Sequence, residues 1–521
     1  MKADRELLLW NWQIEMKTTR TIKTILIANR GEIAVRIIRT CKELDIKAVA
    51  VFSDPDRSAL HVQYADAAFR LPGARASETY LNRELILSIA KRAKVDAVHP
   101  GYGFLSENPD FAALVARAGI AFIGPSADAI RLLGDKTAAR AVARKLKIPT
   151  VAGSENALST EEEAILIAGR IGFPVLLKAA AGGGGKGMRI VRTESEFRQA
   201  YQMAKSESKK AFDDDRIYIE KYIANPHHVE IQILADQHGN VVHLGERDCS
   251  VQRRHQKVIE ESPSPAIDDT TRRAMGTAAV RLAKEAGYTN AGTVEFLVDD
   301  KKKFYFLEVN TRLQVEHPVT EVITSIDIVR EQIRIAEGNR LPMRQETIHR
   351  FGHALECRIY AEDPENDFLP STGLLTQYTP PTGPRTRLDN GAQQGDEIQV
   401  YYDPMLSKVI TWGETRRDAI ESMKRALREF RIHGIQTTIP FCLFALNHNV
   451  FIEGKHSTSF VSQYFSQSHL RSQVGASHRI KAAIAAALFM TRTAGEGLPR
   501  ATPNGKDGHS AWRTKRLENQ R

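Results

Sequence analysis

The chain has 521 residues, of which 42% are hydrophobic and 26% are charged, and its formal net charge is +10. This length indicates roughly three or four domains, and the balanced composition excludes wholesale disorder. The sequence contains no run of about 18 apolar residues, so a membrane-spanning helix is not expected.

The basic excess is concentrated near the C-terminus. Residues 466–521 contain ten Lys/Arg and three Asp/Glu, which leaves the body of the chain with little net charge. A nearly neutral body argues against nucleic acid as the main partner, because nucleic-acid-binding surfaces are strongly basic. A nucleic-acid-binding protein that uses the basic tail is therefore the rival interpretation from a different functional class.

The cysteines offer no metal or disulfide framework. Cys41, Cys249, Cys357 and Cys442 are far apart and form no C-x-x-C pair. This spacing excludes a zinc site of paired cysteines and argues against a disulfide scaffold at this length. The first 20 residues mix apolar and charged side chains and lack the pattern of a signal peptide. We therefore expect reduced thiols in a cytoplasmic protein.

The N-terminal part of the body alternates strand-like and helix-like segments. Apolar runs predict strands at 24–29, 47–53, 95–103 and 120–126, and apolar residues at helical spacing predict a helix at 32–44. This alternation is typical of a parallel α/β sheet. Ligands bind at the carboxyl ends of such strands, which is where HPGYGFLSEN (99–108) falls.

The following segments change character along the chain. A helix is predicted at 134–149, and residues 151–223 form a smaller unit of helix, strand, glycine loop, strand, helix and strand. From residue 228 onward alternating apolar strands predict an antiparallel sheet. Beyond residue 466 the composition predicts disorder, apart from an Ala-rich stretch at 480–490 that could form a helix.

A glycine-rich loop, AAAGGGGKGMR (179–189), is the strongest local signal. Its backbone N–H groups can surround phosphate oxygens, and Lys186 adds positive charge. It is not a Walker A motif, because Gly187 stands where Ser or Thr is needed. The β-like segment after it also argues against a Rossmann turn. A strand–loop–strand hairpin that closes over a nucleotide is the functional interpretation, and a disordered surface loop is the alternative.

Two glutamates are predicted to face each other across a hairpin. Glu295 and Glu308 lie on strands joined by the polar turn 299–303, and Asn310 shares the face of Glu308 by strand alternation. Two carboxylates and an amide oxygen suit Mg²⁺ or Mn²⁺ bound together with substrate phosphates. The alternative is a pair of solvated glutamates on a sheet.

The residues after this hairpin continue the polar pattern. If the chain stays extended, Arg312, Gln314 and Glu316 point the same way as Asn310 and form a small-anion site with a base. The cation-rich segment 246–261 lacks interleaved aromatic residues, so it indicates phosphate or bicarbonate recognition and not base stacking. A charged strand edge and a solvated, salt-bridged strand are the respective alternatives.

In order along the chain, these residues resemble biotin carboxylase, a member of the ATP-grasp superfamily. The matching stretches are IANRGEIAVRIIR, HPGYGFLSEN, FIGP, GDK, KAAAGGGGKGMR, EKY, HVEIQ, ERDCSVQRRHQKVIEE, GTVEF, EVNTRLQVEHPVTE, HALECRIYAEDP and FLPSTG. They span residues 22–465, and the longest of them are highly specific, whereas GDK or the glycine loop alone would not be.

The resemblance implies a mixed α/β and α+β fold with three lobes. These are a Rossmann-like parallel α/β domain at 21–135, an ATP-grasp domain at 136–335 with a mobile glycine-loop lid at about 151–223, and a mostly antiparallel C-terminal domain at 336–466. Residues 1–20 and 467–521 would be extensions outside this body. The implied reaction uses ATP and bicarbonate to carboxylate biotin through carboxyphosphate.

The resemblance also implies roles for individual residues. The implied ATP-binding residues are Lys136, Lys178, Gly184, Gly185, Glu220, Lys221, Ile223, His228, His255, Glu295 and Glu308. The implied metal ligands are Glu295, Glu308 and Asn310, and the implied bicarbonate-binding residues are Lys257, Arg312, Gln314 and Val315. Glu316 would be the general base, Arg358 would stabilise the biotin enolate, Tyr102 would contact biotin, and Lys257 and Arg312 would assist catalysis.

Partners follow from what the sequence lacks. It contains no A-M-K-M biotin-attachment motif and no carboxyltransferase domain, so a separate biotin carboxyl carrier protein and a carboxyltransferase subunit are expected, as in acyl-CoA carboxylases or two-subunit pyruvate carboxylase. The resemblance implies a homodimer, with no membrane and no nucleic-acid partner. The nearest enzymatic alternative is another bicarbonate-using ATP-grasp carboxylate–amine ligase, such as a purine enzyme.

Overall fold

The computed structural model describes residues 20–154, 158, 160–179, 188–212, 215–254, 256–473 and 483–488. The predicted nucleotide ligands Gly184, Gly185 and His255 lie outside these residues, as does most of the basic tail. The chain divides into two compact units, residues 1–467 and 468–521, which are described separately. In the second unit residues 483–488 are helical, within the Ala-rich stretch for which a helix was predicted.

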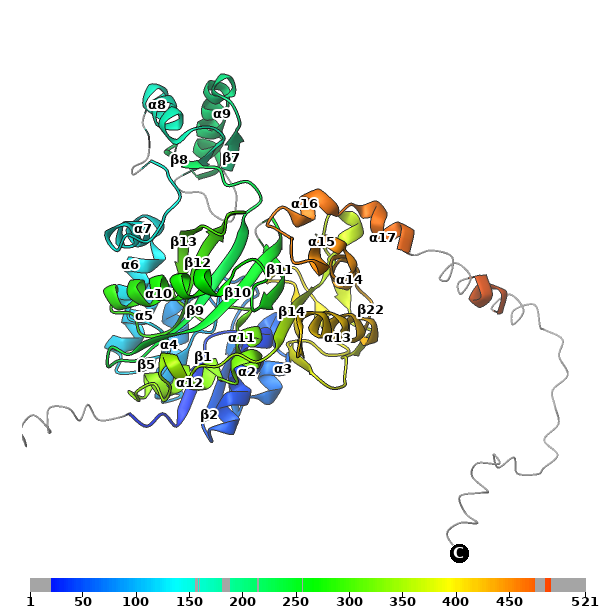
Figure 1. Cartoon of the computed structure of the whole chain (residues 1–521). Helices are drawn as coiled ribbons and strands as arrows, with labels where there is room; N and C mark the ends of the chain where they lie inside the picture. The colour runs from blue at the N-terminus through cyan, green and yellow to red at the C-terminus, as the bar shows by residue number, and fades with distance from the viewer. Residues whose placement is uncertain are drawn as a thin grey trace, which may run out of the picture. The chain divides into compact units, whose positions relative to one another are not determined.

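The N-terminal domain is built on a parallel sheet. Its strands are β1 (Thr24–Ile27), β2 (Lys47–Ser53), β3 (Ala67–Leu71), β4 (Ala97–His99) and β5 (Ala121–Phe122), in the order β3-β2-β1-β4-β5. Every neighbouring pair is parallel, which confirms the predicted α/β class. The apolar residues of β1 are buried because helices cover both faces of such a sheet (Figure 1).

Helix α2 (Gly31–Glu43) follows β1 directly and matches the predicted helix. The chain turns into it at Gly31, whose φ of +63° lies in the left-handed region that favours glycine. The other helices of this domain are η1 (Asp54–Asp56), α3 (Leu60–Tyr64), α4 (Arg83–Arg92), α5 (Pro109–Arg117) and α6 (Ala127–Gly134).

The helix predicted at 134–149 is shorter than expected. The structure has α7 at Lys136–Lys145, separated from α6 by Asp135. The Asp135 side chain accepts a hydrogen bond from the Ala138 N–H at 2.8 Å, so it caps a new helix and does not continue the old one.

Residues 160–221 fold around a small antiparallel sheet, β7-β6-β8. Its strands are β6 (Val175–Ala179), β7 (Met188–Val191) and β8 (Ile217–Lys221), and its helices are α8 (Glu161–Ile171) and α9 (Glu194–Phe212). They share one apolar core, which includes Val175, Phe197 and Ile219. The predicted order of helices and strands is confirmed, while the glycine loop between β6 and β7 lies among the residues not described.

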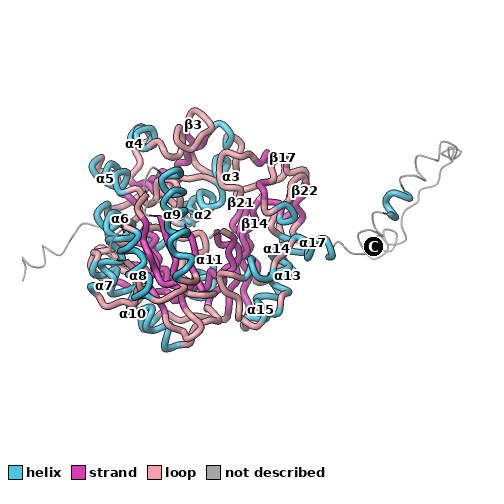
Figure 2. Tube along the Cα trace, turned by 90° about the horizontal axis from the view of Figure 1, so that it is seen from above, coloured by secondary structure: helices cyan, strands magenta, loops and turns pink. Residues whose placement is uncertain are grey.

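A large antiparallel sheet runs through the rest of the body in the order β13-β12-β9-β10-β11-β14-β21-β19. Its strands are β9 (His227–Ala235), β10 (Val241–Arg253), β11 (Gln256–Ser262), β12 (Asn290–Val298), β13 (Phe304–Asn310), β14 (His353–Tyr360), β19 (Thr386–Asn390) and β21 (Met405–Gly413). The pairing of β11 with β14 makes the sheet continuous across the predicted boundary near residue 335. Viewed from above, helices α5, α6 and α7 lie along one side of the strands (Figure 2).

The remaining helices are α10 (Asp269–Glu285), α11 (His317–Thr324), α12 (Ile328–Ala336), η2 (Gln345–Thr347), η3 (Pro364–Asn366), α13 (Arg416–Glu429), α14 (Ile439–Asn447), α15 (Asn449–Ile452), α16 (Phe460–Tyr464) and α17 (Gln467–Gln473). The short strands are β15 (Glu362–Asp363), β16 (Leu369–Pro370), β17 (Gly373–Leu374), β18 (Gln377–Thr379), β20 (Glu397–Ile398) and β22 (Arg431–His433). Within the part of the chain that the structure describes, no helix combines the length and apolarity needed to cross a membrane.

Candidate active site

The hairpin of β12 and β13 places its two glutamates directly opposite each other. Glu295 pairs with Glu308 in the antiparallel register, and Asn310 lies two residues further along β13. The turn between the strands is held by Asp299, whose carboxylate accepts hydrogen bonds from the Lys301 and Lys303 N–H groups. The predicted hairpin and the predicted facing of the two glutamates are both confirmed.

Glu295 is buried and surrounded by donors. Its carboxylate accepts hydrogen bonds from Lys257 Nζ at 2.9 Å, Asn310 Nδ2 at 2.8 Å and Gln314 Nε2 at 3.1 Å. His228 Nε2 lies 2.9 Å from its other oxygen. Burial alone would raise the pKa of Glu295, but Lys257 and His228 outweigh it and hold that pKa well below its usual value. The carboxylate is therefore ionised, as a metal ligand must be.

The chain leaves the sheet after Asn310, so the extended conformation considered for residues 311–316 is wrong. Glu316 is the residue before α11, with φ −81° and ψ 14°. The polar side chains still converge, because Arg312 donates to Asn310 Oδ1 and to Gln314 Oε1, each at 3.0 Å. A turn and not a strand brings them together.

Glu316 is fully buried between two cations. Lys257 Nζ donates to Oε1 at 2.6 Å and Arg358 Nη2 donates to Oε2 at 2.8 Å. Burial again favours the neutral acid, but Lys257, Arg358 and Arg247 outweigh it and hold the pKa of Glu316 well below its usual value. The Glu316 side chain is thus a carboxylate able to accept a proton.

Lys257 is the centre of this cluster. Its Nζ contacts three carboxylates, those of Glu230 and Glu316 at 2.6 Å and that of Glu295 at 2.9 Å. Glu230 is balanced in turn by the fully buried Arg247, whose Nε lies 2.5 Å from it. Sequence reasoning missed Glu230 and Arg247. The signal for Glu230 was its position two residues after His228, on the same strand face.

The predicted nucleotide residues form a second group of ion pairs. Lys136 Nζ lies 2.8 Å from Glu308 Oε2, and Glu220 pairs with Lys178 and with Arg140. Lys221 donates to the carbonyls of Gly172 and Phe173, at 2.9 and 3.0 Å. Lys136 is therefore paired with the β12–β13 hairpin, whereas Lys221 is bound to backbone carbonyls. Ile223 lies just after β8.

Of the two predicted biotin residues, Arg358 contacts Glu316 directly. Arg358, on β14, also pairs through Nε with Glu260 at 2.6 Å. Tyr102 follows β4 and donates a hydrogen bond to Glu32. Asn29 Nδ2 fixes this segment by donating to the carbonyls of Pro100 and Tyr102, each at 2.7 Å. Burial and Glu32 raise the pKa of Tyr102, while Arg358 opposes this rise.

The donor set suits a divalent metal ion. Glu295, Glu308 and Asn310 offer hard oxygen atoms, as Mg²⁺ prefers. Among the described residues, His228, Glu230 and Glu295 also form a group whose ligand atoms lie within 4.8 Å of one another.

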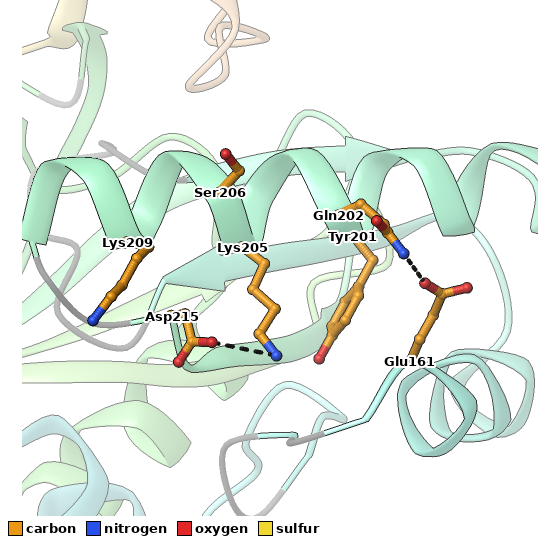
Figure 3. Close-up of a pocket in the computed structure, with 7 residues that line it drawn as sticks. All are labelled: Glu161, Tyr201, Gln202, Lys205, Ser206, Lys209 and Asp215. Atoms are coloured by element: carbon orange, nitrogen blue, oxygen red, sulfur yellow. Dashed lines mark hydrogen bonds and ion pairs between the residues drawn. The ribbon is translucent and has the colours of Figure 1, made fainter.

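A separate hollow of about 390 Å³ lies in the 160–221 segment (Figure 3). It is lined by Glu161, Tyr201, Gln202, Lys205, Ser206, Lys209 and Asp215. Gln202 donates to Glu161 at 2.7 Å and Lys205 lies 3.3 Å from Asp215, so these contacts join α9 to α8 and to the chain before β8. None of the predicted site residues lines it, and we attribute it to the packing of this segment.

Comparisons with known proteins agree with this geometry. Three family models match in succession: Biotin carboxylase, N-terminal domain at residues 21–130; Carbamoyl-phosphate synthase L chain, ATP binding domain at 135–344; and Biotin carboxylase C-terminal domain at 356–463. The chain is 53% identical to Biotin carboxylase 1 of Bacillus subtilis, over 85% of this chain and 99% of that protein. It is 51% identical to the mitochondrial propionyl-CoA carboxylase alpha chain of Sus scrofa, over 86% of this chain and 61% of that protein.

Solved structures show the same similarity. A biotin carboxylase–beta-gamma-ATP complex from Campylobacter jejuni matches with a TM-score of 0.81 and 49% identity, covering 85% of this chain and 99% of that chain. The biotin carboxylase domain of Hydrogenobacter thermophilus 2-oxoglutarate carboxylase, a dimer with MgADP and bicarbonate, matches with a TM-score of 0.82 and 46% identity, covering 87% of this chain and 99% of that chain. The chain belongs to the biotin carboxylase family.

Proposed function

We propose that this protein carboxylates biotin on a carrier protein, consuming ATP and bicarbonate and releasing ADP and phosphate. The observation that carries the proposal is the buried Glu316 carboxylate, held between Lys257 at 2.6 Å and Arg358 at 2.8 Å. Lys257, on β11, also contacts Glu295 among the metal candidates, and Arg358 comes from the neighbouring strand β14. A base placed there can act in the first partial reaction, beside the arginine that acts in the second.

Glu316 acts first as a general base. It takes the proton of bicarbonate, whose oxygen attacks the γ-phosphorus while the bond to ADP breaks. Lys257, Arg312 and Gln314 hold the bicarbonate anion. As Lys257 and Arg358 turn from Glu316 to the substrate anions, the carboxylate loses the charges that depress its pKa and becomes a stronger base.

The second partial reaction uses the other side of the site. Carboxyphosphate breaks into carbon dioxide and phosphate, and phosphate takes the N–H proton of biotin while that nitrogen attacks carbon dioxide. Arg358 stabilises the negative charge that develops on the ureido oxygen, because a preorganised cation in a dry site acts on charge as it forms. Tyr102 positions the ring.

Glu295, Glu308 and Asn310 would hold Mg²⁺, which when bound neutralises charge on the nucleotide phosphates. Lys136 and Lys178 bind those phosphates by charge-assisted hydrogen bonds once they leave Glu308 and Glu220. Gly184, Gly185 and His255 are proposed to complete the nucleotide site, together with Glu220, Lys221, Ile223 and His228.

The decisive test is Glu316→Gln, which keeps the shape of the side chain and removes its basicity. We expect ADP release with free biotin and bicarbonate to fall about a hundredfold or more, the usual contribution of a general base. MgATP binding, measured by calorimetry, should persist.

The matched control is Glu331→Gln, at another buried glutamate, which pairs with Arg334 on α12. This variant should retain activity. Near-normal turnover by Glu316→Gln would remove Glu316 from the mechanism. Biotin-independent turnover that instead requires an aminoimidazole ribotide would favour a purine ligase.

We further propose a separate carrier protein, a carboxyltransferase subunit and a homodimer as the partners. Relatives support this: one is named as a propionyl-CoA carboxylase alpha chain, and one solved relative is described as a domain dimer. Affinity purification of the native protein, followed by a streptavidin blot and mass spectrometry, should reveal a biotinylated partner. Purification of the protein alone at near-native yield would contradict this part of the proposal.

A further inference from the structure

Lys408 is a fully buried lysine on β21, beside the predicted biotin arginine. In the antiparallel register Lys408 pairs with Arg358 of β14 on one side and with Asp389 of β19 on the other. Directly paired residues project to the same face of a sheet, so Lys408 and Arg358 face the same turn. A lysine without solvent is rare and requires partners that compensate its charge.

The two neighbouring cations hold two consecutive residues of that turn. Lys408 Nζ donates to the Val315 carbonyl at 2.7 Å, while Arg358 holds the side chain of Glu316. The preceding carbonyl is also fixed, because His317 Nδ1 lies 2.8 Å from the Gln314 oxygen. The position of the Glu316 backbone therefore depends on Lys408.

The charge of Lys408 is balanced by Glu32, whose Oε1 lies 3.2 Å from Nζ, and by Asp389, whose Oδ2 lies 3.7 Å from it. The same oxygen accepts the hydrogen bond of the Tyr102 hydroxyl. The backbone of Glu32 packs closely against the residue that follows β19, since a Cβ added to Gly391 would lie 2.5 Å from the Glu32 backbone nitrogen. Tyr102, Glu32, Lys408 and Val315 thus form one continuous chain of polar contacts.

We propose that Lys408 is a positioning residue that joins the biotin side of the site to the turn that carries the base. The inference rests on the proposed function. It assigns to Lys408 no contact with substrate: through Glu32 it fixes Tyr102, and through the Val315 carbonyl it fixes Glu316 and the bicarbonate contacts beside it. Displacement of a catalytic group by about 1 Å can cost a hundredfold in rate.

The test compares Lys408→Met, Tyr102→Phe and the double variant, using free biotin as substrate. Methionine fills the space of lysine and cannot donate. We expect Lys408→Met to lower kcat/KM for biotin and for bicarbonate by about tenfold or more, the order of loss expected when a catalytic group is mispositioned. The Kd for MgATP should change less than about threefold.

The double variant supplies a measurement that a merely structural role would not move. If Lys408 and Tyr102 act through the same glutamate, the double variant should be no worse in kcat/KM for biotin than the poorer single variant. The matched control is Lys424→Met, at another buried lysine, which pairs with Glu421 at 3.0 Å on α13. Its kinetics should match those of the unmodified protein.

Folded Lys408→Met protein with unchanged kcat/KM for both substrates would overturn the inference, and so would additive losses in the double variant. If Lys408→Met does not fold, Glu32→Gln takes its place, and unchanged kcat/KM for biotin in that variant would equally overturn it. Failure of the proposed function is distinguishable, because the unmodified protein would then show no biotin-dependent ADP release.

Discussion

At the scale of single residues, two opposing effects decide whether the buried acids of the site are ionised. Desolvation favours the neutral acid, and ion pairing favours the carboxylate. Glu295 and Glu316 are buried acids that remain ionised because Lys257 contacts both of them. Strand alternation in the sequence was enough to group Glu295, Glu308 and Asn310. It offered a signal for Glu230, which shares the strand face of His228, but it could not reveal Arg247, whose role arises from the pairing of β10 with β9.

Arg358→Lys tests the geometry of the enolate-stabilising cation. Lysine keeps the charge but cannot bridge Glu316 and Glu260 as the guanidinium does. We expect kcat for free-biotin carboxylation to fall about a hundredfold, the cost of removing one preorganised donor, while the calorimetric Kd for MgATP stays unchanged. An unchanged kcat would show that charge alone suffices at this position.

At the scale of elements, ion pairs join the sheet to the helices that cover it. Glu261 of β11 accepts hydrogen bonds from Arg416 at the start of α13, and His353 of β14 lies 2.7 Å from it. The strands were predictable because apolar alternation is local, whereas the turn at 311–316 was not, since tertiary contacts of Arg312 and Glu316 decide its shape. The break at Asp135 could have been recognised from its capping side chain.

Glu261 gives this junction a pH dependence. Burial opposes ionisation, but His353 and Arg416 outweigh it and lower the pKa of Glu261 from 4.5 to about 2. Its stabilising contribution is therefore complete above about pH 4.5 and is lost as the pH falls toward 2, at most about 3 kcal/mol in total. Denaturant unfolding should show a smaller loss of stability between pH 5 and pH 3 in Glu261→Gln than in the unmodified protein; equal slopes would contradict this assignment.

At the scale of the whole molecule, the described site residues all belong to the unit that ends at Gln467. The family resemblance predicted three lobes over residues 21–466, because its motifs cover the body from end to end, and the bounds of these lobes remain a prediction. It said nothing of how the large sheet unites the ATP-grasp and C-terminal segments, since the β11–β14 register is a property of the folded chain.

Removal of residues 468–521 should leave free-biotin carboxylation intact. The reason is that no predicted catalytic or binding residue lies in this segment. Steady-state ADP release by the truncated and full-length proteins, purified side by side, provides the measurement. Loss of activity in a folded truncated protein would show that the tail contributes to catalysis. Salt-sensitive DNA binding lost on truncation would identify a side activity of the tail.

The β11–β14 pairing has a consequence for any attempt to divide this protein. Glu316, Lys257 and the metal candidates precede residue 340, whereas Arg358 and Lys408 follow it. The backbone hydrogen bonds between β11 and β14 therefore join two parts of the chain that each supply part of the site. Fragments cut at this point would each display a long bare strand prone to association with other chains. Any recombination of domains within this family must therefore keep β11 and β14 together.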